Sequence, residues 1–341
     1  MSRTAIVLFN LGGPDEPVAV RPFLQNLFSD PAIIALPGPL RWLVARLIAR
    51  RRAPVALEIY RKIGGRSPLL PLTRAQAGAL QQELGDLGTV KVFVAMRYWH
   101  PFAAETVGEV SGFAPDEIIL LPLYPQYSTT TTGSSVKDWQ RAAARAGLQV
   151  RTTIVCCYPD EAGLVAAQAA AVAAGLAEAA RSGRPRVLFS AHGLPEKIVA
   201  GGDPYQAQVE QTAAAVVARL ADPALDWVVC YQSRVGPLKW IGPSTEDELR
   251  RAGRDRVPVV VVPIAFVSEH SETLVELDIE YRHQAAAWGV PAYFRVPALG
   301  TAPDFILGLA GLVREAHGQG GIVPAGGRRH CPAACGRCAL N

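Results

Sequence analysis

The chain lacks the sequence signals of several common classes of protein. Its 341 residues contain neither a P-loop nor a G-x-G-x-x-G pattern, so no motif for ATP or a dinucleotide is present. No Lys/Arg tract is interleaved with aromatic residues, and a net charge of +4 is too small to indicate nucleic acid as a partner. The apolar run before Gly12 is too short for a signal peptide, and later apolar runs are short or Ala-rich, unlike a membrane span. These absences favour a globular protein of the cytoplasm.

Apolar, strand-like runs alternate with helical segments along the chain. The predicted strands are residues 5–11, 90–96, 117–124, 150–157, 186–192, 226–233, 257–266 and 291–296. The predicted helices between them are residues 72–86, 132–146, 160–182, 205–221 and 302–316. This alternation indicates parallel sheets covered by helices on both faces. We therefore expect an α/β protein with two similar doubly wound domains (1–165 and 166–317), each with a four-stranded parallel sheet, a cleft between them and a tail (318–341).

Polar segments follow the predicted strands at the points where ligands of such sheets bind. They read "NLGGP", "MRYWHP", "LYPQYSTTTTGSS", "SAHGLP", "YQSRVG" and "SEHSETLVE". Gly12-Gly13 is best interpreted as a tight turn at a strand end. Residues 129–135 fit an anion site at a helix N-terminus and ordinary helix capping equally well. Together the segments indicate an active-site cleft.

Two histidines and a carboxylate stand out among these segments. His192 ends one apolar strand, and His270 and Glu272 follow another. A single histidine at a strand end is more often a structural residue, but the second group shifts the balance. Neutral imidazole with a carboxylate suits either binding of a divalent metal or acceptance of protons near neutral pH.

A row of carboxylates continues from this group. Glu269, Glu272, Glu276 and Glu280 have helical spacing, with Asp278 off the line, and no Lys or Arg lies between the first and the last. A solvated acidic helix face is one interpretation. The alternative is a path for metal ions or protons, along which the lack of local cationic partners is tolerated.

The sequence resembles the ferrochelatases, which insert ferrous iron into a porphyrin. The resemblance spans about residues 4–316, and it rests on eight segments in the family's order: "LFNLGGP", "YRKIGGRSP", "MRYWHP", "LYPQYSTTTTGSS", "LFSAHGLP", "GGDPY", "YQSRVGPLKWIGP" and "PIAFVSEHSETLVELDIEY". It implies a chelatase-like fold and the last step of haem synthesis. The reaction needs a base for two pyrrole protons and no nucleophile, ATP or nicotinamide.

The resemblance also implies roles for individual residues. His192 would accept pyrrole protons, bind the incoming Fe²⁺, or both, with Glu272 opposite it and His270 beside it. The acidic line Glu272, Glu276 and Glu280 would serve as an iron or proton path. The implied porphyrin contacts are Asn10, Leu11, Arg52, Tyr60, Ser67, Arg97, Tyr98, Tyr124 and Trp240. Asn10-Leu11 before Gly12 favours protoporphyrin IX over coproporphyrin as the substrate, because members that use coproporphyrin have a Tyr at this place.

A basic, partly apolar segment lies at residues 32–54. Trp42, Leu43, Leu47 and Ile48 share a predicted helix with Arg41, Arg46 and Arg50 to Arg52. A surface helix packed at the edge of the cleft is one interpretation. Peripheral contact with the inner face of an anionic membrane is the other, since basic amphipathic helices lie in the interface.

Three cysteines end the chain after a Gly-rich linker (318–327). Cys331, Cys335 and Cys338 have the spacing C-x₃-C-x₂-C, which in a reducing compartment favours a metal centre over disulfides. Resemblance to ferrochelatases with C-terminal cysteines implies a [2Fe–2S] cluster, whose fourth thiolate would come from Cys157 or Cys156. Zinc is the alternative, and Cys230 is expected to be a buried structural thiol. The sequence leaves the oligomeric state open; members with such a tail are often dimers, so a homodimer is one alternative.

Two other functions compete with a protoporphyrin ferrochelatase. A cobalt or nickel chelatase for a more carboxylated tetrapyrrole would need more basic residues around the cleft than Arg52 and its neighbours supply. A binding protein that carries metal or haem would have no use for a base opposite an acidic row, and it would show no turnover.

Overall fold

The computed structural model describes residues 2–234, 236 and 238–341, which form two compact units. Unit 1 consists of Met1–Cys157, Leu309–Arg328 and Leu340. Unit 2 consists of Tyr158–Gly308, Arg329–Ala339 and Asn341. The predicted second domain (166–317) and tail (318–341) are therefore each divided between the two units.

Unit 1 contains a five-stranded parallel sheet in the order β2-β1-β3-β4-β9. Its strands are β1 (Arg3–Asn10), β2 (Thr89–Met96), β3 (Glu117–Pro122), β4 (Arg151–Val155) and β9 (Gly321–Val323). The four strands expected from the sequence are confirmed, but the expected number of four is wrong for this sheet. The fifth strand, β9, lies inside the segment predicted to be a linker, and it pairs with β4 from Thr153↔Gly321 to Val155↔Val323.

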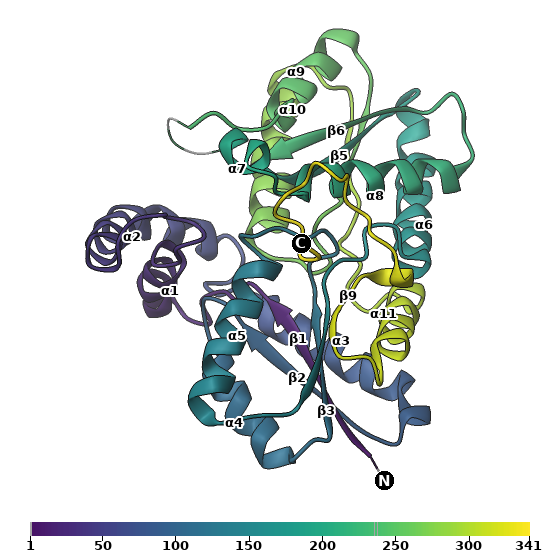
Figure 1. The fold of residues 1–341 in the computed structure, drawn as a ribbon. Helices are drawn as coiled ribbons and strands as arrows, with labels where there is room; N and C mark the ends of the chain where they lie inside the picture. Colours follow the sequence, from purple (N-terminus) through teal and green to yellow (C-terminus); the bar gives the residue numbers. More distant parts are fainter. Residues whose placement is uncertain (1, 235, 237) are drawn as a thin grey trace. The chain divides into compact units, whose positions relative to one another are not determined.

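The helices of unit 1 include two that the sequence did not predict. They are α1 (Val20–Phe28), α2 (Gly38–Arg61), α3 (Leu69–Glu83), α4 (Ala103–Phe113) and α5 (Thr132–Ala146), with short 3₁₀ turns at Pro17–Ala19, Gly85–Leu87 and Ala325–Gly327. The unpredicted helices are α1 and α4. Helix α11 (Pro303–Ala316) passes from unit 2 into unit 1 at Leu309. Figure 1 shows α1 and α2 as a pair to one side of the first sheet.

The core of unit 1 forms because successive residues of its strands face opposite sides of the sheet. On β1, Ala5, Val7 and Phe9 pack with α4 and α5, where Val107 and Trp139 are buried. The intervening strand residues are also buried, so both faces are covered. This pattern explains why the strands read as unbroken apolar runs.

Unit 2 contains a four-stranded parallel sheet, as expected, in the order β6-β5-β7-β8. Its strands are β5 (Arg186–His192), β6 (Asp226–Gln232), β7 (Val259–Pro263) and β8 (Tyr293–Arg295). Its other elements are α6 (Ala162–Ala179), α7 (Glu196–Ala200), α8 (Tyr205–Leu220), α9 (Thr245–Asp255), a π-helix η4 (Glu272–Tyr281), α10 (Arg282–Ala287) and a 3₁₀ turn at Ala180–Ser182.

Helices cover both faces of this second sheet. Phe189 and Val262 belong to a core cluster with α6 and α8, whereas Leu188 and Val261 belong to one with α9, η4 and α10. Figure 1 shows the same division, with α6 and α8 on one side of β5 and β6 and α9 and α10 on the other. The doubly wound arrangement predicted from the sequence is thus present in unit 2.

Helix α6 is long and apolar enough to cross a membrane by length and composition. The qualifying segment is Ala162–Ser182, with a mean hydropathy of 1.5. Its residues Val165, Ala169 and Val172 nevertheless pack into the core over the second sheet. The side chain of Glu161 caps its first turn by accepting hydrogen bonds from the backbone N–H groups of Gly163 and Leu164. We therefore interpret α6 as a core helix whose many alanines allow close packing.

The register of unit 2 brings its polar strand ends to one edge. His192 is the last residue of β5 and lies beside Gln232, the last residue of β6. Strand β7 ends at Pro263 and leads, through residues 264–271, into η4. A π-helix turn is rare and is often found at a functional site. The elements that the sequence singled out therefore meet at the carboxyl edge of the second sheet.

Candidate active site

His192 and Glu272 meet in unit 2, although 80 residues separate them in the sequence. Nδ1 of His192 lies 2.9 Å from Oε2 of Glu272. Of the two side chains, 39% of His192 and 26% of Glu272 is exposed, so both remain reachable by a ligand. Nε2 of His270 lies 3.9 Å from the same carboxylate oxygen. Two imidazoles therefore converge on one carboxylate.

Glu276 extends this group along η4 and is held by residues of β6 and of η4 itself. The backbone N–H of Ser233 donates to its Oε1 at 2.8 Å, and the Ser233 hydroxyl donates to its Oε2 at 2.5 Å. Tyr281 donates to Oε1 at 3.0 Å. Ser233 has a φ of 61°, a backbone conformation that costs energy for a residue other than glycine and that is found at functional sites. The sequence did not single out Ser233, although it falls in the quoted segment "YQSRVG".

The charges of these groups shift one another's pKa values. Burial lowers the pKa of His192, but attraction and a hydrogen bond to Glu272 outweigh burial and leave this pKa raised. Burial raises the pKa of Glu272, but His192 and then His270 outweigh it and hold this pKa far below its ordinary value. Glu276 has the opposite shift, because burial and the Glu272 charge raise its pKa despite the Ser233 hydrogen bonds. The site thus holds one carboxylate that stays ionised beside one that takes up a proton more readily.

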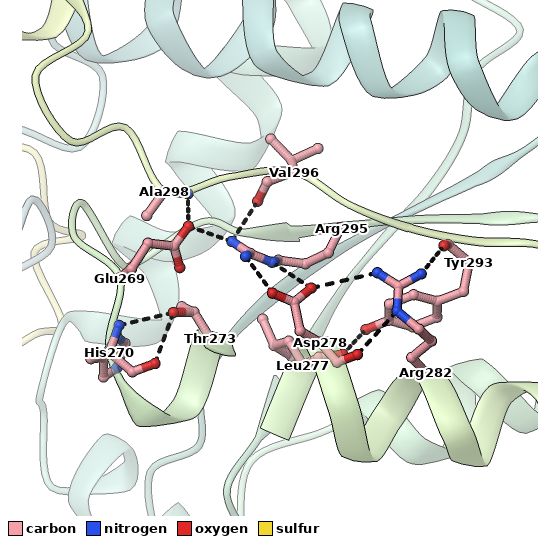
Figure 2. Close-up of polar contacts among 10 residues, drawn as sticks. All are labelled: Glu269, His270, Thr273, Leu277, Asp278, Arg282, Tyr293, Arg295, Val296 and Ala298. Carbon is pink, nitrogen blue, oxygen red and sulfur yellow. Dashed lines mark hydrogen bonds and ion pairs between the residues drawn. The ribbon is translucent and has the colours of Figure 1, made fainter. Parts of the chain in front are cut away.

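The expected acidic row is broken at its first member. Glu269 forms an ion pair with Arg295 of β8, at 2.5 Å from Oε1 to Nη1, and Asp278 pairs with the same guanidinium (Figure 2). The sequence showed no cationic partner within the row, but Glu269 has a distant one, because Arg295 lies 26 residues away along the chain. Glu272 and Glu276 share a cluster, whereas Glu280 is half-buried farther along η4.

Trp240 lies beside the turn that follows His192. Its Cε3 atom is 3.3 Å from the position that a Cβ of Gly193 would occupy, and Trp240 forms an isolated bridge with Pro195. The indole Nε1 is buried and has no hydrogen-bond partner among the described residues. Buried polar groups without a partner are rare, and such a donor is available to a ligand. Residues 235 and 237 of the same segment lie outside the described residues.

The pair Arg97-Tyr98 follows β2 in unit 1 and is held by a residue that the sequence analysis missed. Asp30 accepts from Nη2 of Arg97 at 2.9 Å, from the Tyr98 hydroxyl at 2.8 Å and from Ser134. Nε of Arg97 donates to Ser134 at 2.7 Å, and Asp138 lies 3.6 Å from Nη1. The only sequence signal for Asp30 is a carboxylate before a proline at the end of a helix. Arg97 also borders a pocket of about 630 Å³ with Arg41, Arg141 and Arg145.

Four other predicted porphyrin contacts lie around the first strand-end turn of unit 1. Asn10 is buried; its amide donates to Thr73 at 3.0 Å and accepts from the backbone N–H of Leu11. A Cβ on Gly13 would lie 2.5 Å from Oγ of Ser67 and 3.9 Å from the Tyr60 hydroxyl. Only glycine fits at this position, so the second glycine of "LGGP" serves packing. Asn10, Leu11, Tyr60 and Ser67 thus lie around this turn, and their contact with the porphyrin stays a prediction.

The remaining two predicted contacts of unit 1 have different surroundings. Arg52 is exposed on α2. Tyr124 packs against the buried core of the first sheet. No ligand contact of either residue follows from these positions alone, and their assignment to the porphyrin stays a prediction.

The comparisons with known proteins agree with the predicted family. The family model described as Ferrochelatase matches residues 3–317. A ferrochelatase of Phenylobacterium zucineum is 56% identical over 342 aligned positions, covering 99% of this chain and 98% of that protein. One of Caulobacter vibrioides is 54% identical over 340 positions, covering 98% and 97%. This chain belongs to the ferrochelatase family. The predicted enzyme class, a ferrochelatase of porphyrin and haem synthesis that takes Fe²⁺ as a substrate, is confirmed at this level.

Solved structures outside the ferrochelatases share the fold. SirB from Bacillus subtilis with Fe³⁺ matches with a TM-score of 0.55 at 12% identity, covering 93% of this chain and 96% of that one. DR2241 from Deinococcus radiodurans, described as similar to chelatases, matches with a TM-score of 0.51 at 15% identity, covering 96% of this chain and 56% of that one. At such identities the matches show the fold alone. They confirm a chelatase-like α/β architecture for a ferrochelatase sequence.

The cysteines of this ferrochelatase do not form a ready metal centre. In unit 2 the sulfurs of Cys331 and Cys338 are 2.8 Å apart and buried, whereas Cys335 is partly exposed. Burial and then neighbouring Cys338 raise the pKa of Cys335. Across the described ranges, no three His, Cys, Asp or Glu side chains form a group suited to a metal ion. The tail as placed therefore does not fit a four-thiolate cluster.

The other cysteines lie within a strand or directly after one. Cys156 and Cys157 follow β4 in unit 1, with their sulfurs 3.3 Å apart, and both are buried. Cys230 is fully buried inside β6, and burial raises its pKa to about 12, as fits the predicted structural thiol. Neither position shows which cysteine, if any, would complete a cluster.

Proposed function

We propose that His192 and Glu272 handle the protons and the metal when this ferrochelatase inserts Fe²⁺ into protoporphyrin IX. The observation that supports it is the 2.9 Å contact between a half-exposed imidazole and a carboxylate that His270 also approaches. Neutral imidazole accepts protons near pH 7, and both groups are suitable ligands for a divalent metal. Asp30 with Arg97 offers no comparable base, because the group has no imidazole and its carboxylate, only 2% exposed, is paired with a permanent cation.

The protons released in the reaction can be accounted for with these groups. Two pyrrole N–H protons leave for each Fe²⁺ that enters, and no electron is transferred. His192 takes up one proton when its imidazole is neutral. Glu276 is the acceptor for the second, because burial and the charge of Glu272 raise its pKa. Glu272 remains ionised between them and balances the charge of the imidazolium. Glu280 would continue the path away from the site.

The proposed porphyrin contacts divide by chemistry. Trp240 offers a ring face and a free indole N–H beside His192. Tyr60, Tyr124 and Leu11 offer apolar contact, and Asn10 and Ser67 offer polar contact. Arg52 would pair with a propionate, and Arg97 with Tyr98 would form a further contact with the porphyrin.

We also propose that α2 contacts the surface of an anionic membrane on the cytoplasmic side. Its buried face consists of Ala45, Ala49, Ala53 and Tyr60. Large apolar side chains are nevertheless exposed on the same helix: Leu40 (49%), Trp42 (50%), Leu43 (58%), Leu47 (51%) and Val55 (63%). They alternate with arginines, as in helices that lie in the interface. Sedimentation with phosphatidylglycerol vesicles tests this, and wild-type binding by Leu43→Ser/Leu47→Ser would contradict it.

The predicted [2Fe–2S] cluster and homodimer remain proposals for the tail. The adjacent sulfurs of Cys331 and Cys338 support binding of some metal, and a cluster would require Cys335 and a fourth thiol to move towards them. Iron and acid-labile sulfide in the protein purified without oxygen would indicate the cluster, and one zinc ion per chain would indicate the alternative. Light scattering measures the mass of the assembly directly.

The proposed roles are tested by anaerobic turnover of Fe²⁺ and protoporphyrin IX, followed by the loss of porphyrin fluorescence. We expect wild-type turnover, and a loss of about a hundredfold or more in His192→Ala with porphyrin binding retained. His283→Ala removes an exposed histidine of unit 2 and is the matched control. Porphyrin or haem binding without wild-type turnover would favour a carrier, and preferred insertion of Co²⁺ or Ni²⁺ into a more carboxylated tetrapyrrole would favour the other chelatases. Full activity of His192→Ala would remove this residue from the mechanism.

A further inference from the structure

Arg295 of β8 forms a buried bridge between two carboxylates of unit 2. Only 9% of its side chain is exposed. Its Nε donates to Oδ1 of Asp278 at 2.9 Å, Nη2 donates to Oδ2 of the same carboxylate at 2.5 Å, and Nη1 donates to Oε1 of Glu269. Figure 2 shows the guanidinium of Arg295 between the two carboxylates. The bidentate geometry on Asp278 is one that arginine, and not lysine, provides.

The two carboxylates flank the segment that carries the proposed metal-handling groups. Glu269 directly precedes His270, and Asp278 lies two residues after Glu276. One guanidinium therefore holds both ends of residues 270–276, including Glu272. Arg295 lies on β8, which pairs with β7, and β7 pairs with β5, the strand that carries His192. Arg295 therefore attaches residues 270–276 to the same sheet that positions His192.

Further donors from the same strand and the loop after it complete the attachment. The hydroxyl of Tyr293 donates to the carbonyl of Leu277 at 2.7 Å, and Arg282 donates to the carbonyl of Tyr293 at 2.7 Å (Figure 2). The backbone N–H of Ala298 donates to Oε1 of Glu269 at 2.9 Å. These contacts hold η4 to the strand and the loop after it, and η4 is a π-helix, a rare conformation often found at functional sites.

The ion pairs of Arg295 divide the carboxylates of the segment into neutralised and unneutralised ones. Arg295 neutralises Glu269 and Asp278, which do not face His192. In the part of the chain that the structure describes, no Lys or Arg forms an ion pair with Glu272 or Glu276. Their negative charge is thus left for imidazoles, protons and an incoming cation.

We propose that Arg295 is a positioning residue for the handling of Fe²⁺: by bridging Glu269 and Asp278, it fixes Glu272 and His270 at the correct distance from His192. This inference rests on the proposed function of the His192–Glu272 pair. Arg295 does not contact that pair. The inference nevertheless gives it an effect on the kinetics of Fe²⁺ insertion, separate from its effect on the stability of the fold.

The test compares Arg295→Met with Arg186→Met, a matched control. Arg186 lies on β5 of the same unit, 7% of its side chain is exposed, and it also bridges two carboxylates, Asp226 and Asp255, at 2.9 Å each. It lies at the first residue of its strand, away from His192. Both substitutions remove a guanidinium shared by two carboxylates, so both are expected to lower the denaturation midpoint. The control is matched here too, because Asp278 keeps Arg282 at 3.5 Å and Asp255 keeps Arg251 at 3.9 Å.

Only Arg295→Met is expected to change the kinetics of the folded enzyme. At a temperature where circular dichroism shows every variant folded, its kcat falls about tenfold to a hundredfold and its KM for Fe²⁺ rises, whereas its KM for protoporphyrin stays within about twofold. Arg295→Lys keeps the charge but loses the fork, so it restores part of this loss. Arg186→Met keeps kcat and both KM values within about twofold of the wild type.

Two outcomes would overturn the inference: wild-type kinetics in folded Arg295→Met, or an equal loss in Arg186→Met. If Arg295→Met does not fold, Glu269→Gln and Asp278→Asn each remove one arm of the bridge, and wild-type kinetics in both would count against it equally. The same assays first measure Fe²⁺ insertion by the wild type. Absence of insertion there would contradict the proposed function and not the role of Arg295.

Discussion

At the end of β5 in unit 2, His192 shares one contact with Glu272, and 39% of its side chain is exposed. After β2 in unit 1, Arg97 is bound by Asp30, Ser134 and Asp138, and 13% of its side chain is exposed. Both groups follow strands of parallel sheets in the position where ligands bind. In unit 1 a permanent cation is saturated by carboxylates, whereas in unit 2 a titratable base faces a carboxylate and keeps an open side. The first arrangement resists change, and the second is built for proton exchange.

The largest effect expected from this comparison is on turnover. Glu272→Gln removes the charge that holds the imidazolium of His192, so kcat should fall by about a hundredfold or more. The unfolding free energy should change by about 1 kcal/mol or less, because the pair is partly exposed. Stopped-flow porphyrin fluorescence and urea denaturation measure the two quantities. A large loss of stability with little loss of turnover would reverse the roles assigned to the two clusters.

The next effect concerns the stability of unit 1. Asp30→Asn leaves the guanidinium of Arg97 without its buried partner, and the loss should be about 3–5 kcal/mol. Urea denaturation of the full chain measures it. Asp86→Asn breaks the exposed pair with Arg314 and should leave the midpoint unchanged. Equal midpoints for the two variants would show that the Asp30 cluster is not a structural anchor.

The smallest effect is a shift in pH dependence. Only neutral His192 accepts a proton, and Glu272 raises its pKa above the ordinary 6.5, so kcat/KM should rise with pH through a value above 6.5. In Glu272→Gln the same limb should move to lower pH. An unshifted limb in that variant would mean that another group limits turnover on the acid side.

His192 and Glu272 make stability contributions that depend on pH in opposite directions. The raised pKa of His192 adds stability that is complete below 6.5 and is lost as pH rises through the folded value. The lowered pKa of Glu272 adds stability that is present above 4.5 and is lost as pH falls through the folded value. The pair therefore contributes most between about pH 4.5 and 6.5, on the acid side of the range where the base is active.

The sequence predicted the regular parts of the fold because burial on both faces leaves an unbroken apolar run in each long strand. It missed β9, since Gly321–Val323 is only three residues long, lies within a Gly-rich segment and joins the sheet through backbone hydrogen bonds. Helix α9 was missed because it is highly polar, although Ser244 caps it. The other edge strand of three residues, β8, was predicted because it lies within a longer strand-like run at residues 291–296.

The sequence predicted only those residues of the candidate site that local sequence patterns mark. His192 and Glu272 were found because polar residues at the ends of parallel strands meet at one edge. The partners of Glu269 and Arg97 were not found, since Arg295 and Asp30 are 26 and 67 residues away and nothing local marks them. Ion pairs between distant segments depend on the folded topology, and one sequence does not show them.

The path of the chain through the two units affects how the protein is made. Residues up to Cys157 leave the ribosome first, but unit 1 also needs Leu309–Arg328, which follow almost all of unit 2. Until β9 is synthesised, β4 is an open strand edge, a surface that favours aggregation. Because domains fold from the N-terminus during synthesis, the nascent first sheet must wait, incomplete, while about 150 residues are translated. This interval makes the newly synthesised chain, rather than the finished enzyme, the form most dependent on chaperones.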